Sequence, residues 1–130
     1  MEIKILLLMI LCHIIDDFVL QPVCLSNLKQ KQWWEKNVLN ISKKYRDMYE
    51  DDYEIALLIH SLSWSIMISL PFMFLVEFNQ IALIIMVVIN TIIHYIVDDL
   101  KANKFKINLW FDQGCHFLQL ILTYVILYNI

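Results

Sequence analysis

The sequence predicts an all-α integral membrane protein, a four-transmembrane-helix bundle with an interfacial, partly helical first cytoplasmic loop. Three observations predict this class: 60% of the 130 residues are hydrophobic, the mean hydropathy is +0.61, and the apolar residues gather in four long runs. A soluble domain of this length could not bury so much apolar surface, because its surface-to-volume ratio is too high. We therefore expect a single membrane domain over residues 1–130.

The four expected spans each approach the roughly 20 mostly apolar residues that a bilayer requires. They cover residues 3–20, 55–76, 81–100 and 109–130. Residues 21–54, between the first two expected spans, form a polar stretch rich in lysine, asparagine and aromatic residues. Aromatic rings settle at membrane–water interfaces, so this loop is expected to contain a helix lying at the membrane surface.

The basic residues predict the orientation. Loop 21–54 carries six of them and loop 101–108 carries three, whereas the connection between the second and third spans carries none. By the positive-inside rule both basic loops face the cytoplasm and both termini face outward. An even number of spans also requires the termini to share a side, so the two inferences agree.

The remaining composition excludes several classes. The net charge of −3 is mild, and the basic residues lie in loops rather than along one face, so we expect no nucleic-acid partner. Cys12, Cys24 and Cys115 have no regular spacing, which disfavours a disulfide framework. A lipoprotein signal ending at Cys12 is disfavoured because Leu11 is not small and the apolar run continues to Leu20.

Ionisable residues inside spans are expensive and by default mark a site. The first, third and fourth expected spans each carry polar residues at a spacing of three or four, which places them on one helix face. The second span adds one histidine. These residues are His13, Asp17 and Gln21; His94, Asp98 and Lys101; Asp112 and His116; and His60.

The histidines are expected at one depth. Counted from the cytoplasmic helix ends they lie about five to seven residues in, so their depths differ by only about 3 Å. Asp17, Asp98 and Asp112 lie about one turn closer to the cytoplasm. We call the four histidines and these aspartates the His/Asp layer. Asp16 and Asp99 are expected to point elsewhere, toward water or lysines at headgroup level.

A histidine and an aspartate four residues apart on a helix are neighbours and can hold one metal ion. Nitrogen and oxygen donors suit Zn, Mn or Fe. Asp17, Asp98 or Asp112 could also act as a catalytic general base, and Gln21, Lys29 and Lys101 could attract a substrate phosphate. A metal-free polar clamp or a proton relay is the alternative. The candidate metal ligands are His13, Asp17, His60, His94, Asp98, Asp112 and His116.

The string His13-Ile-Ile-Asp-Asp17-Phe-Val-Leu-Gln21, with Lys29 following, resembles the opening His-x-x-x-Asp-Phe-x-Leu-Gln signature of the family called domain of unknown function 3307. Its members are small membrane proteins of bacteria and their phages. One departure is Cys24-Leu25, where the family has a Trp-Met pair. The resemblance implies a multi-pass protein of the bacterial inner membrane, but no activity. Further matches are His60, His94-x-x-x-Asp98 with Lys101, and Asp112-Gln113-x-x-His116.

Three functions remain open from the sequence. The favoured one is a metal-dependent hydrolase or transferase acting on a lipid or prenyl-phosphate headgroup, since the His/Asp layer lies at the depth of such an ester in the cytoplasmic leaflet. The second is a homo-oligomeric ion or proton transporter or channel, which is disfavoured because residues 81–89 and 120–127 are almost uniformly apolar. The third is a membrane-anchored protein whose loop 21–54 binds a cytoplasmic protein or anionic lipid.

Overall fold

The computed structural model describes residues 3–21 and 23–129, so position 22 of the first loop and position 130 of the last expected span fall outside it. In the described residues every regular element is a helix, which confirms the all-α prediction. The long elements are α1 (Ile3–Ile14), continued by the π-helical turn η1 (Ile15–Val19), α5 (Asp52–Leu75), α6 (Gln80–Ala102) and α7 (Leu109–Asn129). The short elements are α2 (Val23–Leu28), α3 (Lys31–Trp34), the π-helical η2 (Glu35–Leu39) and α4 (Lys43–Tyr49).

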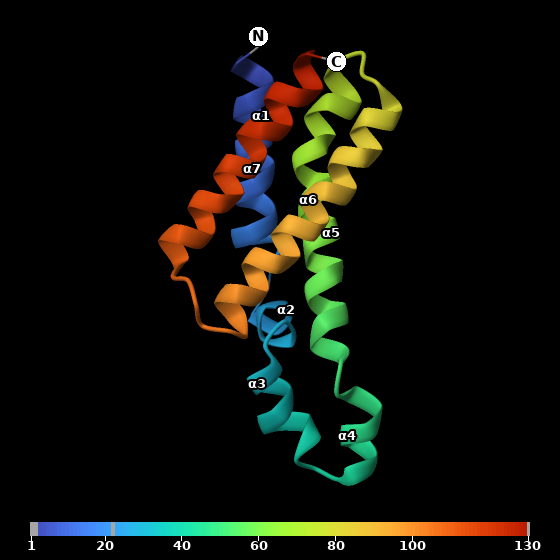
Figure 1. Cartoon of the computed structure of the whole chain (residues 1–130), viewed down its shortest axis with the longest axis vertical. Helices are drawn as coiled ribbons and strands as arrows, with labels where there is room; N and C mark the ends of the chain where they lie inside the picture. Colours follow the sequence, from blue (N-terminus) through green and yellow to red (C-terminus); the bar gives the residue numbers. More distant parts are fainter. Residues whose placement is uncertain (1–2, 22, 130) are drawn as a thin grey trace.

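The long helices pack side by side in a ring. Helix α5 contacts α1 and α6, and α7 contacts α6 and α1. The beginning of α1, the end of α7 and the α5–α6 connection lie together at one end, as Figure 1 shows. Local signals set the helix starts: Asn79 caps α6 by accepting from the backbone N–H groups of Ile81 and Ala82, and Asp52 and Glu54 place negative charge in the first turn of α5.

Two helical segments are long and apolar enough to cross a membrane. Within the described residues they are Lys43–Leu75, which contains α4 and α5, and Gln80–Ala102, which is α6; the 18-residue window of each has a mean hydropathy of 1.7 and 2.2, respectively. These segments contain most of the expected spans 55–76 and 81–100. The expected spans 3–20 and 109–130 are helical as well, forming α1 with η1 and α7.

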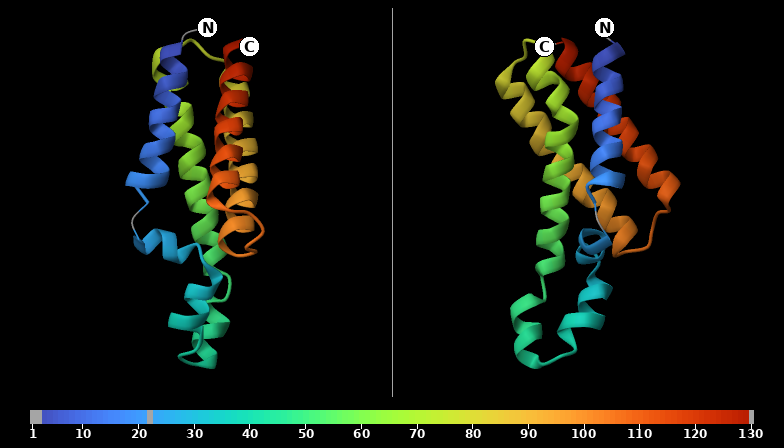
Figure 2. Two further views of the ribbon diagram at one scale, coloured as in Figure 1. Left: turned by 90° about the vertical axis from the view of Figure 1, so that its left-hand side faces the viewer. Right: turned by 180° about the vertical axis from the view of Figure 1, so that it is seen from behind.

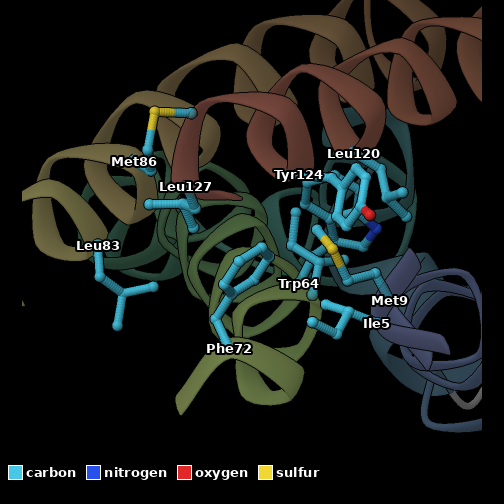
Figure 3. Close-up of a cluster of buried hydrophobic side chains, with 10 residues drawn as sticks. Ile5, Met9, Trp64, Phe72, Leu83, Met86, Leu120, Tyr124 and Leu127 are labelled. Atoms are coloured by element: carbon cyan, nitrogen blue, oxygen red, sulfur yellow. The ribbon is translucent and has the colours of Figure 1, made fainter. Parts of the chain in front are cut away.

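Apolar side chains occupy both the inside and the outside of the helix ring. Inside, a buried cluster that includes Trp64, Phe72 and Leu120 fills the half toward the chain ends, as Figure 3 shows. Outside, large apolar side chains are exposed along all of the long helices, for example Leu7, Ile59 and others on α1, α5, α6 and α7. An exposed apolar surface of this extent is suited to lipid rather than water.

Loop 21–54 is partly helical, as expected, but most of it does not lie across the helix ends. Elements α3, η2 and α4 form a hairpin (residues 31–49) that projects beyond the long helices along their axis, as both views of Figure 2 show. Its aromatic residues pack on one another: Trp34 stacks on Tyr49 with ring centroids 6.3 Å apart, and Trp33 meets Trp34 edge to face at 5.5 Å. The contact between Trp34 and Tyr49 joins α3 to α4 within the hairpin, and the expected position of this loop at the membrane interface stays a prediction.

Buried serines line the inner face of α5. Ser61, Ser65 and Ser69 donate their hydroxyl groups to the carbonyl oxygens four residues earlier, at 2.8, 2.8 and 2.7 Å. The hydroxyls are therefore satisfied within the helix, and the small side chains let neighbouring helices approach closely. Helix α5 makes its most extensive contacts with α6 and α1.

This packing predicts that Ser65→Leu destabilises the fold by about 1–3 kcal/mol, because a larger side chain must displace its neighbours. Ser65→Ala removes only a hydroxyl that bonds its own helix, so we expect little change. The free energy of unfolding in mixed detergent micelles measures both effects. A leucine variant as stable as the wild type would show that α5 is not closely packed at this position.

Candidate metal centre

The His/Asp layer forms at the hairpin end of the ring from residues of every long helix. The His94 and His116 rings stack with centroids 4.0 Å apart, His60 and His94 are 5.1 Å apart, and His13 and His116 are 6.2 Å apart. All of these histidines are buried. The expectation that residues distant in the chain share one layer is therefore confirmed for the histidines.

Two overlapping groups of residues could hold metal ions: Asp17, His60 and His94, and His94, Asp98 and His116. The ligand atoms of each group lie within 4.8 Å of one another. A tetrahedral ion with bonds of about 2.1 Å separates its ligand atoms by about 3.4 Å. The separations from His60 Nε2 come close to this value: 3.2 Å to His94 Nε2, and 3.5 Å to Asp17 Oδ1 and Asp98 Oδ2.

Asp98 connects the two groups through its two oxygens. Its Oδ2 faces His60, whereas its Oδ1 lies 3.4 Å from His116 Nε2. Asp112 Oδ1 also lies 3.4 Å from His116 Nε2. The same residues can therefore hold either one ion or two ions bridged by the Asp98 carboxylate, an arrangement suited to phosphoryl chemistry.

Unsatisfied polar atoms concentrate in this layer. Buried polar atoms without a hydrogen-bond partner are rare, and each costs about 1–3 kcal/mol. Among the described residues, four of the six such side-chain atoms belong to the layer, and a fifth, Asp16 Oδ2, lies beside it near His60. The four are His94 Nδ1, Asp112 Oδ1 and both ring nitrogens of His116. Asp112 Oδ1 and His116 Nε2 face each other, and a bound ion would satisfy both.

The charges of the layer are also unbalanced. Lys29 pairs with Asp98 and Lys101 pairs with Asp112, each at 2.6 Å. Within the part of the chain that the structure describes, no lysine forms a salt bridge with Asp16 or Asp17. With neutral histidines, the four aspartates and two lysines therefore carry a formal charge of −2. Uncompensated charge in an apolar surrounding is strongly unfavourable. One divalent cation would bring the total to zero.

Both nitrogens of His13 are already engaged. Its Nδ1 accepts a hydrogen bond from the Trp64 indole at 2.8 Å, and its Nε2 lies 3.2 Å from Gln113 Oε1. His13 therefore orients neighbouring groups in this structure, and its predicted role as a ligand stays a prediction. The Trp64 ring also stacks on His94 at 4.4 Å. Trp64 was not predicted from the sequence, although it follows His60 by one helical turn and so shares its face.

Asp16 corrects an expectation. It was expected to face water or lysines at headgroup level, but it is buried, accepts a hydrogen bond from Ser63 at 2.8 Å and lies 3.8 Å from His60 Nδ1. The cause is η1, whose wider i→i+5 turn reduces the angle between successive residues and brings Asp16 and Asp17 to the same side. Asp99 does face a lysine: Lys104 lies 2.6 Å from it, and this hydrogen bond raises the pKa of Lys104.

The expected phosphate-binding residues lie at the mouth of the layer. Lys29 is buried. With the Gln21 amide turned so that its oxygen faces Lys29, this oxygen accepts a hydrogen bond from Lys29 Nζ at 2.5 Å and the amide nitrogen donates to the Asp17 carbonyl. A cavity of about 190 Å³ is lined by Gln21, Lys29 and Lys101 together with Asp17, His60 and Asp98. The candidate metal ligands and the basic residues therefore line the same cavity.

No protein-family model matches the chain, and the curated proteins and the solved structures contain no significant match either. The fold and the site therefore define only a class: an all-α protein with two helices able to cross a membrane and with His/Asp groups able to bind metal.

We predict that Trp64→Phe lowers the free energy of unfolding by about 1–3 kcal/mol, because His13 Nδ1 is left buried without its donor. The variant keeps an aromatic ring at this position, although a smaller one than the indole that stacks on His94. Trp110→Phe is the matched control, since Trp110 is 88% exposed and the same change there should have little effect. Equal stability of the two variants would contradict the proposed importance of the indole N–H group.

Proposed function

We propose that this protein is a four-span membrane protein that binds a divalent transition metal in its His/Asp layer and hydrolyses or transfers a lipid or prenyl-phosphate headgroup at the cytoplasmic leaflet. The observation that carries the proposal is the convergence of ligand atoms at metal-like spacing beside two lysines and a cavity. The proposal includes membership of the family called domain of unknown function 3307 and a place in the bacterial inner membrane.

The membrane part of the proposal is supported by the surface of α1 and α7. Both helices expose large apolar side chains outward, as α5 and α6 do, and both direct polar residues into the ring. Only lipid makes this pattern favourable on every side of the ring. With four spans, the six basic residues of loop 21–54 face the cytoplasm together with the hairpin.

The metal part is supported by the chemistry of the ligands. Imidazole nitrogens and carboxylate oxygens suit Zn, Mn or Fe, and no thiolate lies in either ligand group. Such an ion polarises a phosphoryl oxygen and lowers the pKa of water. Asp112 lies beside the ligands and Asp17 is one of them, and the carboxylate of either that is not bound to metal could accept the proton of an attacking water.

The lysines complete the chemistry. While Asp98 and Asp112 are free of metal, they hold Lys29 and Lys101. If Asp98 and Asp112 also held a cation, both ion pairs would weaken, because the cation and the lysines would share the same negative charge. Lys29 and Lys101 could then pair with the phosphate. In a hydrolytic step, the water oxygen would bond to phosphorus and give one proton to a carboxylate, the ester P–O bond would break, and the departing alkoxide would take up that proton.

A conducting path is less well supported. In the half of the ring away from the hairpin the interior is filled by large apolar side chains, including Ile5, Met9 and Phe72 (Figure 3). The few polar groups between the layer and this cluster bond each other: Asn90 donates to Thr123 at 2.8 Å, and Gln119 donates to the Asn90 carbonyl at 3.0 Å. A site open at one end favours an enzyme over a transporter.

The topology makes a first prediction. A membrane-impermeant maleimide added to intact bacterial spheroplasts should label a cysteine introduced by Glu77→Cys, in the α5–α6 connection, but not the native exposed Cys24. The background carries Cys12→Ala and Cys115→Ala. Labelling of Cys24 should appear after the membrane is permeabilised. Labelling of both cysteines before permeabilisation would contradict the four-span orientation.

The metal makes a second prediction. Protein purified in mild detergent should contain a transition metal, and Asp98→Asn should lower metal affinity by at least about tenfold. Asp99→Asn is the matched control, because Asp99 pairs with Lys104 outside the ligand groups. Elemental mass spectrometry measures the bound metal, and release of phosphate from an anionic lipid in mixed micelles measures the reaction.

Hydrolysis should fall by about 100-fold or more in Asp98→Asn and remain unchanged in Asp99→Asn. A folded wild type that holds no metal after reconstitution with Zn, Mn and Fe would overturn the metal centre. The layer would then act as a polar clamp or proton relay. A protein that holds metal but leaves every lipid phosphate intact would retain the metal centre and refute the enzyme.

A further inference from the structure

An apolar groove of about 220 Å³ runs along the seam where α1 and η1 meet α7. Most of its lining is apolar, from Ile14, Phe18, Leu109, Trp110 and Phe117. These side chains are exposed at the surface of the ring, so the groove opens sideways. In a four-span protein, this side faces the hydrocarbon of the bilayer.

The groove adjoins the polar cavity of the His/Asp layer. Phe18, Leu109 and Gln113 line both spaces. Gln113 forms the partition: its Nε2 lies 3.2 Å from Asp112 Oδ2 and 3.4 Å from Asp17 Oδ2, and its Oε1 lies 3.2 Å from His13 Nε2. One side of this residue is therefore ionic and the other is apolar.

We propose that this seam is a lateral portal, through which an anionic lipid phosphate enters from the bilayer with its hydrocarbon chain in the groove and its phosphate at Lys29 and Lys101. The proposal rests on the proposed function and specifies its substrate as a membrane-resident amphiphile rather than a soluble phosphate. Charge supports this occupant once a divalent cation offsets the carboxylates of the layer, because Lys29 and Lys101 at the polar end can then pair with a phosphate, whereas the apolar end offers an anion no partner.

The partition explains how one molecule can contact both spaces. A headgroup that enters along the groove meets the Gln113 amide before it reaches the metal ligands. The amide can exchange its hydrogen bonds with carboxylates for bonds to phosphate oxygens. The hydrocarbon chain remains on Phe18 and Leu109, so no apolar surface has to enter the polar cavity.

Photolabelling in vesicles tests the portal without requiring turnover. The probes are a monoacylglycerol phosphate and a polyprenyl phosphate, each with a diazirine in its chain near the phosphate, and a phosphatidylcholine with the same diazirine as the bulk-lipid control. We expect the anionic probes to label residues 14–18 and 109–117 several-fold more than the exposed face of α6, whereas phosphatidylcholine labels all lipid-facing helices evenly. The anionic probe that labels more strongly identifies the chain type.

Ile14→Trp, which fills the groove, should reduce this labelling several-fold. Ile93→Trp is the matched control, because Ile93 is the same residue type, is 40% exposed against 43% for Ile14, and lies on α6 away from the groove. The portal is overturned if the anionic probes distribute like phosphatidylcholine, or if the two variants label alike. Metal content is measured on the same samples: preferential labelling without metal refutes the proposed function alone, and metal without preferential labelling refutes the portal alone.

Discussion

The structure depends on one electrostatic constraint: a cluster of carboxylates is buried among apolar helices and must be compensated. Lys29 reaches Asp98 from the first loop, and Lys101 reaches Asp112 from the end of α6, each at 2.6 Å. These contacts connect the loop to α6 and α6 to α7. The Lys29–Asp98 pair is buried on both sides, so removing one partner is expected to be strongly destabilising, because the other charge is then left unpaired. The position of the first loop therefore depends on the layer it covers.

The remainder of the ring is organised around this requirement. The His/Asp layer occupies one end, the apolar cluster around Trp64 and Phe72 occupies the other, and Trp64 belongs to both, since its ring stacks on His94 and its indole N–H donates to His13. A short polar clasp of Asn90, Gln119 and Thr123 holds α6 to α7 between them. Close packing on the apolar side restricts movement of the side chains of the layer. A metal centre requires such restriction if its ligands are to keep their geometry.

Much of this arrangement was predictable because helical periodicity is regular. The four-residue spacing of His13 and Asp17, and of His94 and Asp98, is sufficient to place each pair on one face. Asp16 was misplaced because a π-helical turn cannot be recognised from residue types, and it changes the face of every residue that follows. The role of Trp64 depends on the orientation of its ring, which only tertiary packing determines.

The loop between the first two expected spans was the least predictable segment. Its aromatic residues are equally compatible with a membrane surface and with a small core of their own, and the stacking of Trp34 on Tyr49 supports the second outcome. Similarly, Lys29 could have been any solvated lysine in a basic loop. Its burial against Asp98 depends on a contact across 69 residues, for which the local sequence contains no signal.

The order of the chain has a consequence for biogenesis. Asp16 and Asp17 leave the ribosome early, whereas their partners on α5 and α7, such as Ser63, His60 and Gln113, follow much later. In the proposed four-span protein, the end of α1 would expose two unpaired carboxylates to hydrocarbon until those helices are inserted, which is unfavourable. Under that proposal the first segment is expected to stay at the membrane surface until the later helices are inserted, and the site would then assemble as the fold is completed.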